Sequence, residues 1–116
     1  MRKFWNLADA AVYALLTRDG QGKWNYNCCT YVTAVGMHPK HYMIAVYHGT
    51  KSLENLRNNP HQRVVLHLLS PQQAPLIRVL GRQSGFEIDK HARLHRGGHL
   101  VNWKEYPVLK EASAWA

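Results

Sequence analysis

The chain has 116 residues, with 15 Lys and Arg against 7 Asp and Glu, and carries a formal charge of +8 when its histidines are neutral. This length suits a single domain over residues 1–116, and no run approaches the roughly 18 to 20 apolar residues of a membrane span, so we expect a soluble globular protein. The N-terminal MRKFWNLADA contains no apolar run of signal-peptide length, which favours the cytoplasm.

The first half of the chain is predicted to form a short helix and three antiparallel strands. Asn6 can cap a helix over 6–11, and the apolar run 12–17 favours a buried strand. Turn residues at 19–22 then predict a hairpin into a long strand over 23–35, which is rich in aromatic and β-branched residues. A Pro-containing connection over 37–41 leads to the third strand, over 42–47.

The second half is predicted to add a helix over 53–58, a fourth strand over 63–69 and another helix. Ser70 and Gln73 have the spacing of a capping box, whereas Pro75 favours a start of the last helix nearer Ala74. The apolar stripe of that helix, which should face the sheet, consists of Leu76, Ile77 and Leu80. Strands followed by helices at connections predict a mainly β protein, an antiparallel sheet closed into a small barrel with accessory helices.

The residues Tyr47-His48-Gly49-Thr50-Lys51-Ser52 join a predicted strand to a predicted helix. Gly49 permits a sharp turn and close backbone approach, the hydroxyls can donate or accept hydrogen bonds, and Lys51 adds charge beside a helix N-terminus. This chemistry favours an anion, phosphate above all. In the alternative interpretation, Thr50 or Ser52 merely caps the helix and Lys51 is solvated.

The adjacent Cys28 and Cys29 are expected to be reduced thiols, because a disulfide between chain neighbours would be strained. Their alternation in a strand sends one thiol to each face of the sheet, and the inward one is expected to pack in the core or line a cofactor site.

Three histidines at intervals of four, His91, His95 and His99, could bind a metal if they shared a helix face. Gly97 and Gly98 argue against a persistent helix, so we expect a solvated basic loop and no metal site. The positive charge favours anionic partners, but the basic residues are scattered and no nucleic-acid motif occurs, so nucleic acid is not the expected partner. P-loop, nucleophile-elbow and Rossmann motifs are also absent from the sequence.

About residues 5–115 resemble a known protein family, and three segments are the basis of that resemblance. They are the strand 25–33 with Asn27, Cys29 and Thr30, the junction 47–52, and Ser84-Gly85-Phe86-Glu87-Ile88-Asp89-Lys90. In their order and spacing, the chain resembles the flavin-reductase-like family of FMN-binding split barrels.

The resemblance implies FMN as cofactor, with its phosphate at the junction 47–52. The implied cofactor-binding residues are Asn27, Cys28, Cys29, Thr30, Tyr47, His48, Gly49, Thr50, Lys51 and Ser52. Ser84 and Lys90 would border the nicotinamide or the acceptor. No catalytic acid or base is assigned, because the flavin would carry the hydride chemistry.

The implied activity is NAD(P)H-dependent reduction of flavin or a flavin-linked acceptor. The alternatives are a non-catalytic FMN-binding protein and a basic nucleic-acid-binding barrel, whose four Trp could stack on bases. Relatives commonly form dimers and continue past the segment that corresponds to ASAW with strands that help close the barrel, whereas this chain stops at Ala116. We therefore expect a homodimer that covers the open edges.

Overall fold

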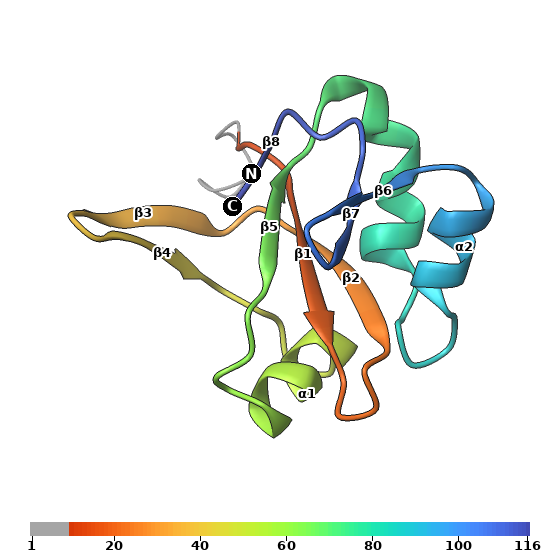
Figure 1. Cartoon of the computed structure of the whole chain (residues 1–116), viewed down its shortest axis with the longest axis horizontal. Helices are drawn as coiled ribbons and strands as arrows, with labels where there is room; N and C mark the ends of the chain where they lie inside the picture. The colour runs from red at the N-terminus through yellow and green to blue at the C-terminus, as the bar shows by residue number, and fades with distance from the viewer. Residues whose placement is uncertain (1–9) are drawn as a thin grey trace, which may run out of the picture.

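The computed structural model describes residues 10–116, whose strands form one four-stranded sheet and two hairpins (Figure 1). The sheet has the order β2-β1-β5-β8, and its neighbouring strands are antiparallel. The bounds are Tyr13–Arg18 for β1, Trp24–Cys29 for β2, Val65–Leu68 for β5 and Ala114–Trp115 for β8. The predicted helix over 6–11 lies outside the described residues except for Ala10 and Ala11, which are not helical.

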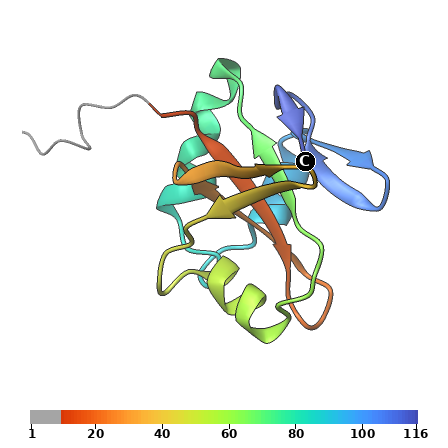
Figure 2. The same ribbon diagram turned by 90° about the vertical axis from the view of Figure 1, so that its left-hand side faces the viewer.

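The two hairpins stand apart from this sheet. One consists of β3 (Val32–Met37) and β4 (Lys40–Ile44), and the other of β6 (Leu100–Trp103) and β7 (Tyr106–Leu109). Figure 1 shows the β3–β4 hairpin extending away from the body of the molecule, and in Figure 2 the same hairpin points toward the viewer. Its strands therefore have few neighbours within the described chain.

The predicted hairpin at 19–22 is confirmed, since β1 pairs with β2 and Gly22 N donates to Asp19 O at 3.1 Å. The fourth predicted strand is also confirmed, because β5 joins the sheet beside β1. The single strand over 23–35 is wrong. A local turn, in which Val32 N donates to Thr30 O, separates β2 from β3, so β3 leaves the sheet and, among residues 10–116, pairs with β4 alone.

Four helical segments of residues 10–116 pack around the sheet: α1 (Lys51–Asn58), the 3-10 helix η2 (Pro71–Leu76), the π-helix η3 (Arg78–Arg82) and α2 (Lys90–Arg96). The Gln73 side chain accepts a hydrogen bond from Ser70 N at 3.0 Å, which fixes the helix start at Pro71 rather than near Ala74. Within the predicted stripe, Leu80 is fully buried and Leu76 packs against the core.

The prediction of a solvated loop around the three histidines is wrong for residues 90–96, which form helix α2. The Asp89 carboxylate caps its N-terminus by accepting from Ala92 N at 3.0 Å. Gly97 follows as the C-cap, and its N–H donates to Arg93 O. The glycines therefore end a helix of two turns instead of preventing it.

The core lies between the sheet, the helices and the β6–β7 hairpin. Its buried members are Ala14, Leu16, Tyr26, Val65, Leu80, Leu94, Val108 and Leu109. Helix α1 contacts β1 and β2, while η3 and α2 both contact β2. No helix among residues 10–116 is long and apolar enough to cross a membrane. The packing brings the N-termini of α1 and α2 close to the end of η3 along one edge of β2.

Candidate functional site

A cleft of about 190 Å³ opens where β2, the start of α1, the end of η3 and the start of α2 meet. Its lining residues are Asn25, Asn27, Gly49, Thr50, Lys51, Gly81, Arg82, Gln83, Ser84, Gly85 and Lys90. We call this the cationic cleft, because its lining includes two lysines and an arginine and no Asp or Glu. The structure thus brings together six predicted site residues from three distant segments: Asn27, Gly49, Thr50, Lys51, Ser84 and Lys90.

The turn before α1 has the conformation that its sequence predicts. Gly49 has a positive φ of 76°, a left-handed conformation that glycine adopts without steric cost. Thr50 is the N-cap: its Oγ1 accepts from Leu53 N at 3.2 Å and donates to Tyr47 O at 2.8 Å. The capping role that the sequence left open for this hydroxyl is therefore confirmed.

Ser52 lies behind the cleft rather than in it. Its side chain is fully buried, and its Oγ accepts a hydrogen bond from Asn25 Nδ2 at 3.1 Å. This bond ties helix α1 to strand β2. Ser52 therefore positions Asn25, a lining residue that the sequence analysis did not select.

Lys51 is the cation nearest the start of α1. Its Nζ lies 2.8 Å from Glu54 Oε2 and 5.3 Å from the centre of the Phe86 ring. The side chain of Lys51 is 24% exposed and that of Glu54 is 45% exposed, so solvent weakens their attraction. An anion in the cleft would compete with Glu54 for the ammonium group.

Arg82 is a cleft residue that sequence reasoning missed. It lies at the C-terminal end of π-helix η3, directly before the Gln83-Ser84-Gly85 segment, and its side chain is exposed. The available signal was a basic residue next to a segment already singled out. With Lys51, it places a cation on each of two segments that line the cleft.

Lys90 lies deep in the same cleft and is 3% exposed. Its Nζ donates a hydrogen bond to Leu80 O at 2.8 Å, which leaves further N–H groups of the ammonium for another acceptor. Burial lowers the pKa of Lys90 to about 8, against an opposing effect of the nearby Cys28. A buried cation of this kind favours an anion beside it.

We expect Lys90→Met to change how stability depends on pH. Because the folded pKa of about 8 lies below the ordinary 10.5, the unfolded chain binds more protons between these values, and the parent should gain stability as pH rises through them. The variant lacks this gain. Urea unfolding of both proteins from pH 7 to 10.5 should show the variant's stability advantage shrinking with pH, whereas a constant difference would contradict the buried charge.

Gly85 marks a close approach inside the cleft. A Cβ atom at this position would collide with Asn25 Oδ1 and lie 2.9 Å from Lys51 Cβ. A second hollow of about 260 Å³ adjoins the cleft and shares Asn25, Lys51, Gly85 and Lys90 with it. The two hollows together reach the volume of roughly 300 to 1,000 Å³ that is usual for small-molecule sites.

The other predicted residues are not among those that line the cationic cleft. Cys28, Cys29, Thr30 and Tyr47 line a cavity of only about 20 Å³, which Asn27 borders as well. His48 is exposed and is not among the lining residues of either cavity. Burial raises the pKa of Cys29 to about 11 and also raises that of Cys28, despite the nearby Lys90, so both residues are neutral thiols.

Comparison with known proteins gives one family match. The family model described as "Flavin reductase like domain" matches residues 9–116. No curated protein is significantly similar to the chain.

Solved structures with the same fold include an FMN-binding protein from Thermus thermophilus with bound p-hydroxybenzaldehyde, with a TM-score of 0.78 and 18% identity. An FMN-binding domain of a flavin reductases-like enzyme from Shewanella baltica OS155 gives 0.75 and 20% identity. The styrene monooxygenase flavin reductase from Pseudomonas putida S12 gives 0.70 and 17%.

The matches cover 99%, 91% and 91% of this chain but only 62%, 55% and 62% of those structures. The chain therefore spans less than two thirds of their length. The expected mainly β split-barrel class is confirmed.

Proposed function

The chain belongs to the flavin reductase-like domain family, and on this premise we propose that it binds FMN in the cationic cleft and reduces flavin or a flavin-linked acceptor with NAD(P)H. The observation that carries the proposal is the cluster of Lys51, Arg82 and Lys90 around a cleft without a lining carboxylate, beside the N-terminus of α1. Cations and a helix N-terminus both favour a phosphate group.

The residues of the cleft fit such a ligand. Lys90 has unused N–H groups on a buried ammonium, and the absence of a side chain at Gly85 lets its backbone lie close to Asn25 and Lys51. Lys51 and Arg82 can hold the phosphate, and Asn27 and Ser84 offer polar groups for the rest of the molecule. When bound, FMN supplies the hydride chemistry, and the chain supplies binding, orientation and positive charge.

Ser84 and Lys90 are assigned to the side of the cleft that faces the nicotinamide or the acceptor. Both line the cationic cleft, and Lys90 also lines the adjoining hollow. A cation at this position favours the negatively charged forms of a bound nucleotide.

Flavin fluorescence titration and NAD(P)H oxidation test the proposed function. Purified protein titrated with FMN should show saturable quenching of flavin fluorescence, and NADH or NADPH should then be oxidised in the presence of excess FMN. FMN binding without NAD(P)H oxidation would instead support a non-catalytic FMN-binding protein. If FMN does not bind at all, the result contradicts both the flavin reductase and the non-catalytic FMN-binding protein.

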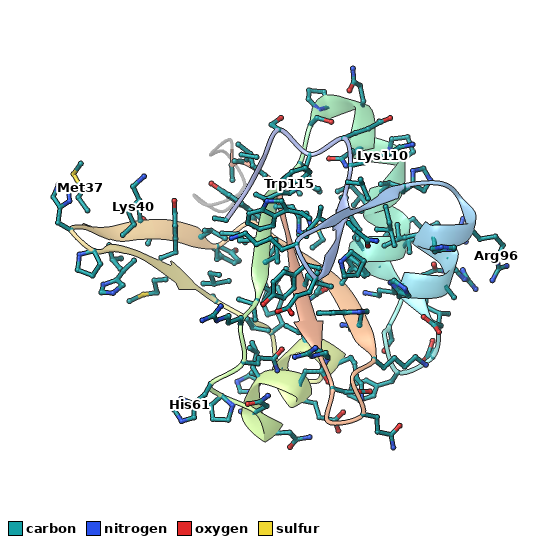
Figure 3. The ribbon with its side chains drawn as sticks, viewed as in Figure 1. Met37, Lys40, His61, Arg96, Lys110 and Trp115 are labelled. Carbon is teal, nitrogen blue, oxygen red and sulfur yellow. The ribbon has the colours of Figure 1, made fainter. Side chains whose placement is uncertain are left out.

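We also propose that the β3–β4 hairpin forms a homodimer interface. Four of its apolar side chains are 49% to 76% exposed: Val35, Met37, Tyr42 and Met43. Figure 3 shows Met37 at the tip of this hairpin, far from the body of the molecule. Exposed apolar side chains on a protruding hairpin are typical of an interface rather than of a free surface.

We expect Met43→Lys to weaken this dimer by at least about 10-fold, because it places a charge within an apolar contact. Sedimentation velocity at micromolar concentrations should show the parent as a dimer and the variant shifted to monomer. Val101→Lys, at an exposed apolar residue of β6, serves as the control and should remain dimeric. A parent protein that sediments as a monomer would contradict the proposal.

A further inference from the structure

A third hollow, of about 300 Å³, lies between α2 and the β6–β7 hairpin and shares no lining residue with the cationic cleft. Its lining includes the imidazoles of His91 and His95, together with Asn102 and Glu105. The flavin proposal uses none of these side chains. These four side chains present nitrogen or oxygen atoms that can bind a polar ligand or an ion, and apolar residues line the rest of the hollow.

His91 and His95 are four residues apart on helix α2, so they share one helix face. Their ring centroids are 6.2 Å apart, with the ring planes at 41°. Two imidazoles on one tetrahedral ion, with metal–nitrogen bonds of about 2.1 Å, have centroids roughly 5 Å apart. Because His95 is exposed, a small side-chain rotation is sufficient to reach this geometry.

Tyr26 selects the tautomer of His91. Its hydroxyl donates to Pro107 O at 2.6 Å, and its oxygen lies 3.4 Å from His91 Nδ1, with the two ring planes within 3° of parallel. Since the hydroxyl has only one hydrogen, already used toward Pro107, the contact with His91 requires the imidazole to donate from Nδ1. The Nε2 lone pair of His91 is then free to bind a ligand, which is how metal-binding histidines are usually oriented.

We propose that His91 and His95 bind one divalent transition-metal ion of the imidazole-preferring class, Zn²⁺, Ni²⁺ or Cu²⁺. Residues 10–116 contain no group of three or more His, Cys, Asp or Glu side chains arranged to hold an ion. The two imidazoles are therefore the only side-chain ligands that this inference assigns. Water or a small ligand admitted by the hollow completes the coordination, as in metal sites with open positions.

The test is calorimetric titration of ZnCl₂, and separately NiCl₂, into the full chain without FMN and without an affinity tag. We expect saturable binding of one ion per chain. His91→Gln and His95→Gln should each weaken it by at least about 10-fold, because each removes one of two ligands. His61→Gln is the matched control, since His61 is exposed and lies far from α2 (Figure 3), and it should leave the affinity unchanged.

The same variants distinguish metal binding from FMN binding. Because His95 is exposed, His95→Gln should fold normally and bind FMN like the parent. The metal site is overturned if the parent shows no saturable binding up to about 1 mM ion. It is also overturned if His95→Gln binds as tightly as the parent, or if His61→Gln loses as much affinity as His95→Gln.

Discussion

Lys51→Ala is expected to weaken FMN binding by about 10- to 100-fold, because a charge-assisted hydrogen bond to phosphate contributes roughly 1.5 to 3 kcal/mol. Lys51 lies at the start of α1 in the cationic cleft, where the helix N-terminus also favours an anion. Riboflavin lacks the phosphate, so its affinity should hardly change. Fluorescence titration of both flavins against parent and variant makes this comparison.

The structure adds a control that the sequence did not offer. Lys51 Nζ pairs with Glu54 Oε2 at 2.8 Å, so the carboxylate competes with a bound phosphate for the same ammonium. Glu54→Gln should therefore bind FMN more tightly than the parent, by a few fold, since the pair is partly exposed and solvent-screened. Added salt should weaken FMN binding more in the parent than in Lys51→Ala.

Each outcome has a definite meaning. Equal losses for FMN and riboflavin in Lys51→Ala would show that the substitution damaged the cleft as a whole. Unchanged binding of both flavins would support the alternative interpretation, in which Lys51 is a solvated residue of a capped helix. The phosphate would then have to lie elsewhere, for example at Arg82.

The strands and helices that the sequence predicts correctly depend on local signals. The turn at 19–22 and the cap of α1 both lie within a few residues of the elements that they define. The exit of β3 from the sheet has no such signal, because the residues 23–35 favour an extended chain throughout and only tertiary packing decides which strand they pair with.

The residues of the candidate site divide in the same way, into those that local sequence predicts and those that only packing between distant segments brings together. The junction at Gly49 to Lys51 could be predicted, because a glycine turn and a helix N-terminus are adjacent in sequence. The buried orientation of Ser52 could not, because it depends on which face of α1 packs against β2. Arg82 joins the cleft only through the packing of η3 against β2, which is a contact between distant segments.

Gly85→Ala is expected to disrupt the cleft without removing any polar group from it. The new Cβ would collide with Asn25 Oδ1 and lie 2.9 Å from Lys51 Cβ, so Asn25 must move away from its 3.1 Å hydrogen bond with Ser52. Overpacking of this kind costs about 1 to 3 kcal/mol of unfolding free energy. Both FMN and riboflavin should bind more weakly, in contrast to the phosphate-selective loss expected for Lys51→Ala.

Gly20→Ala is the matched control for this substitution, because a Cβ at Gly20 would meet no atom within 4 Å. Both variants restrict the unfolded chain to the same extent, so the difference between their unfolding free energies isolates the contact at Gly85. Urea unfolding should show Gly85→Ala less stable than Gly20→Ala by about 1 to 3 kcal/mol. If the two variants are equally stable and bind FMN equally well, the close packing of Gly85 against Asn25 does not shape the flavin site.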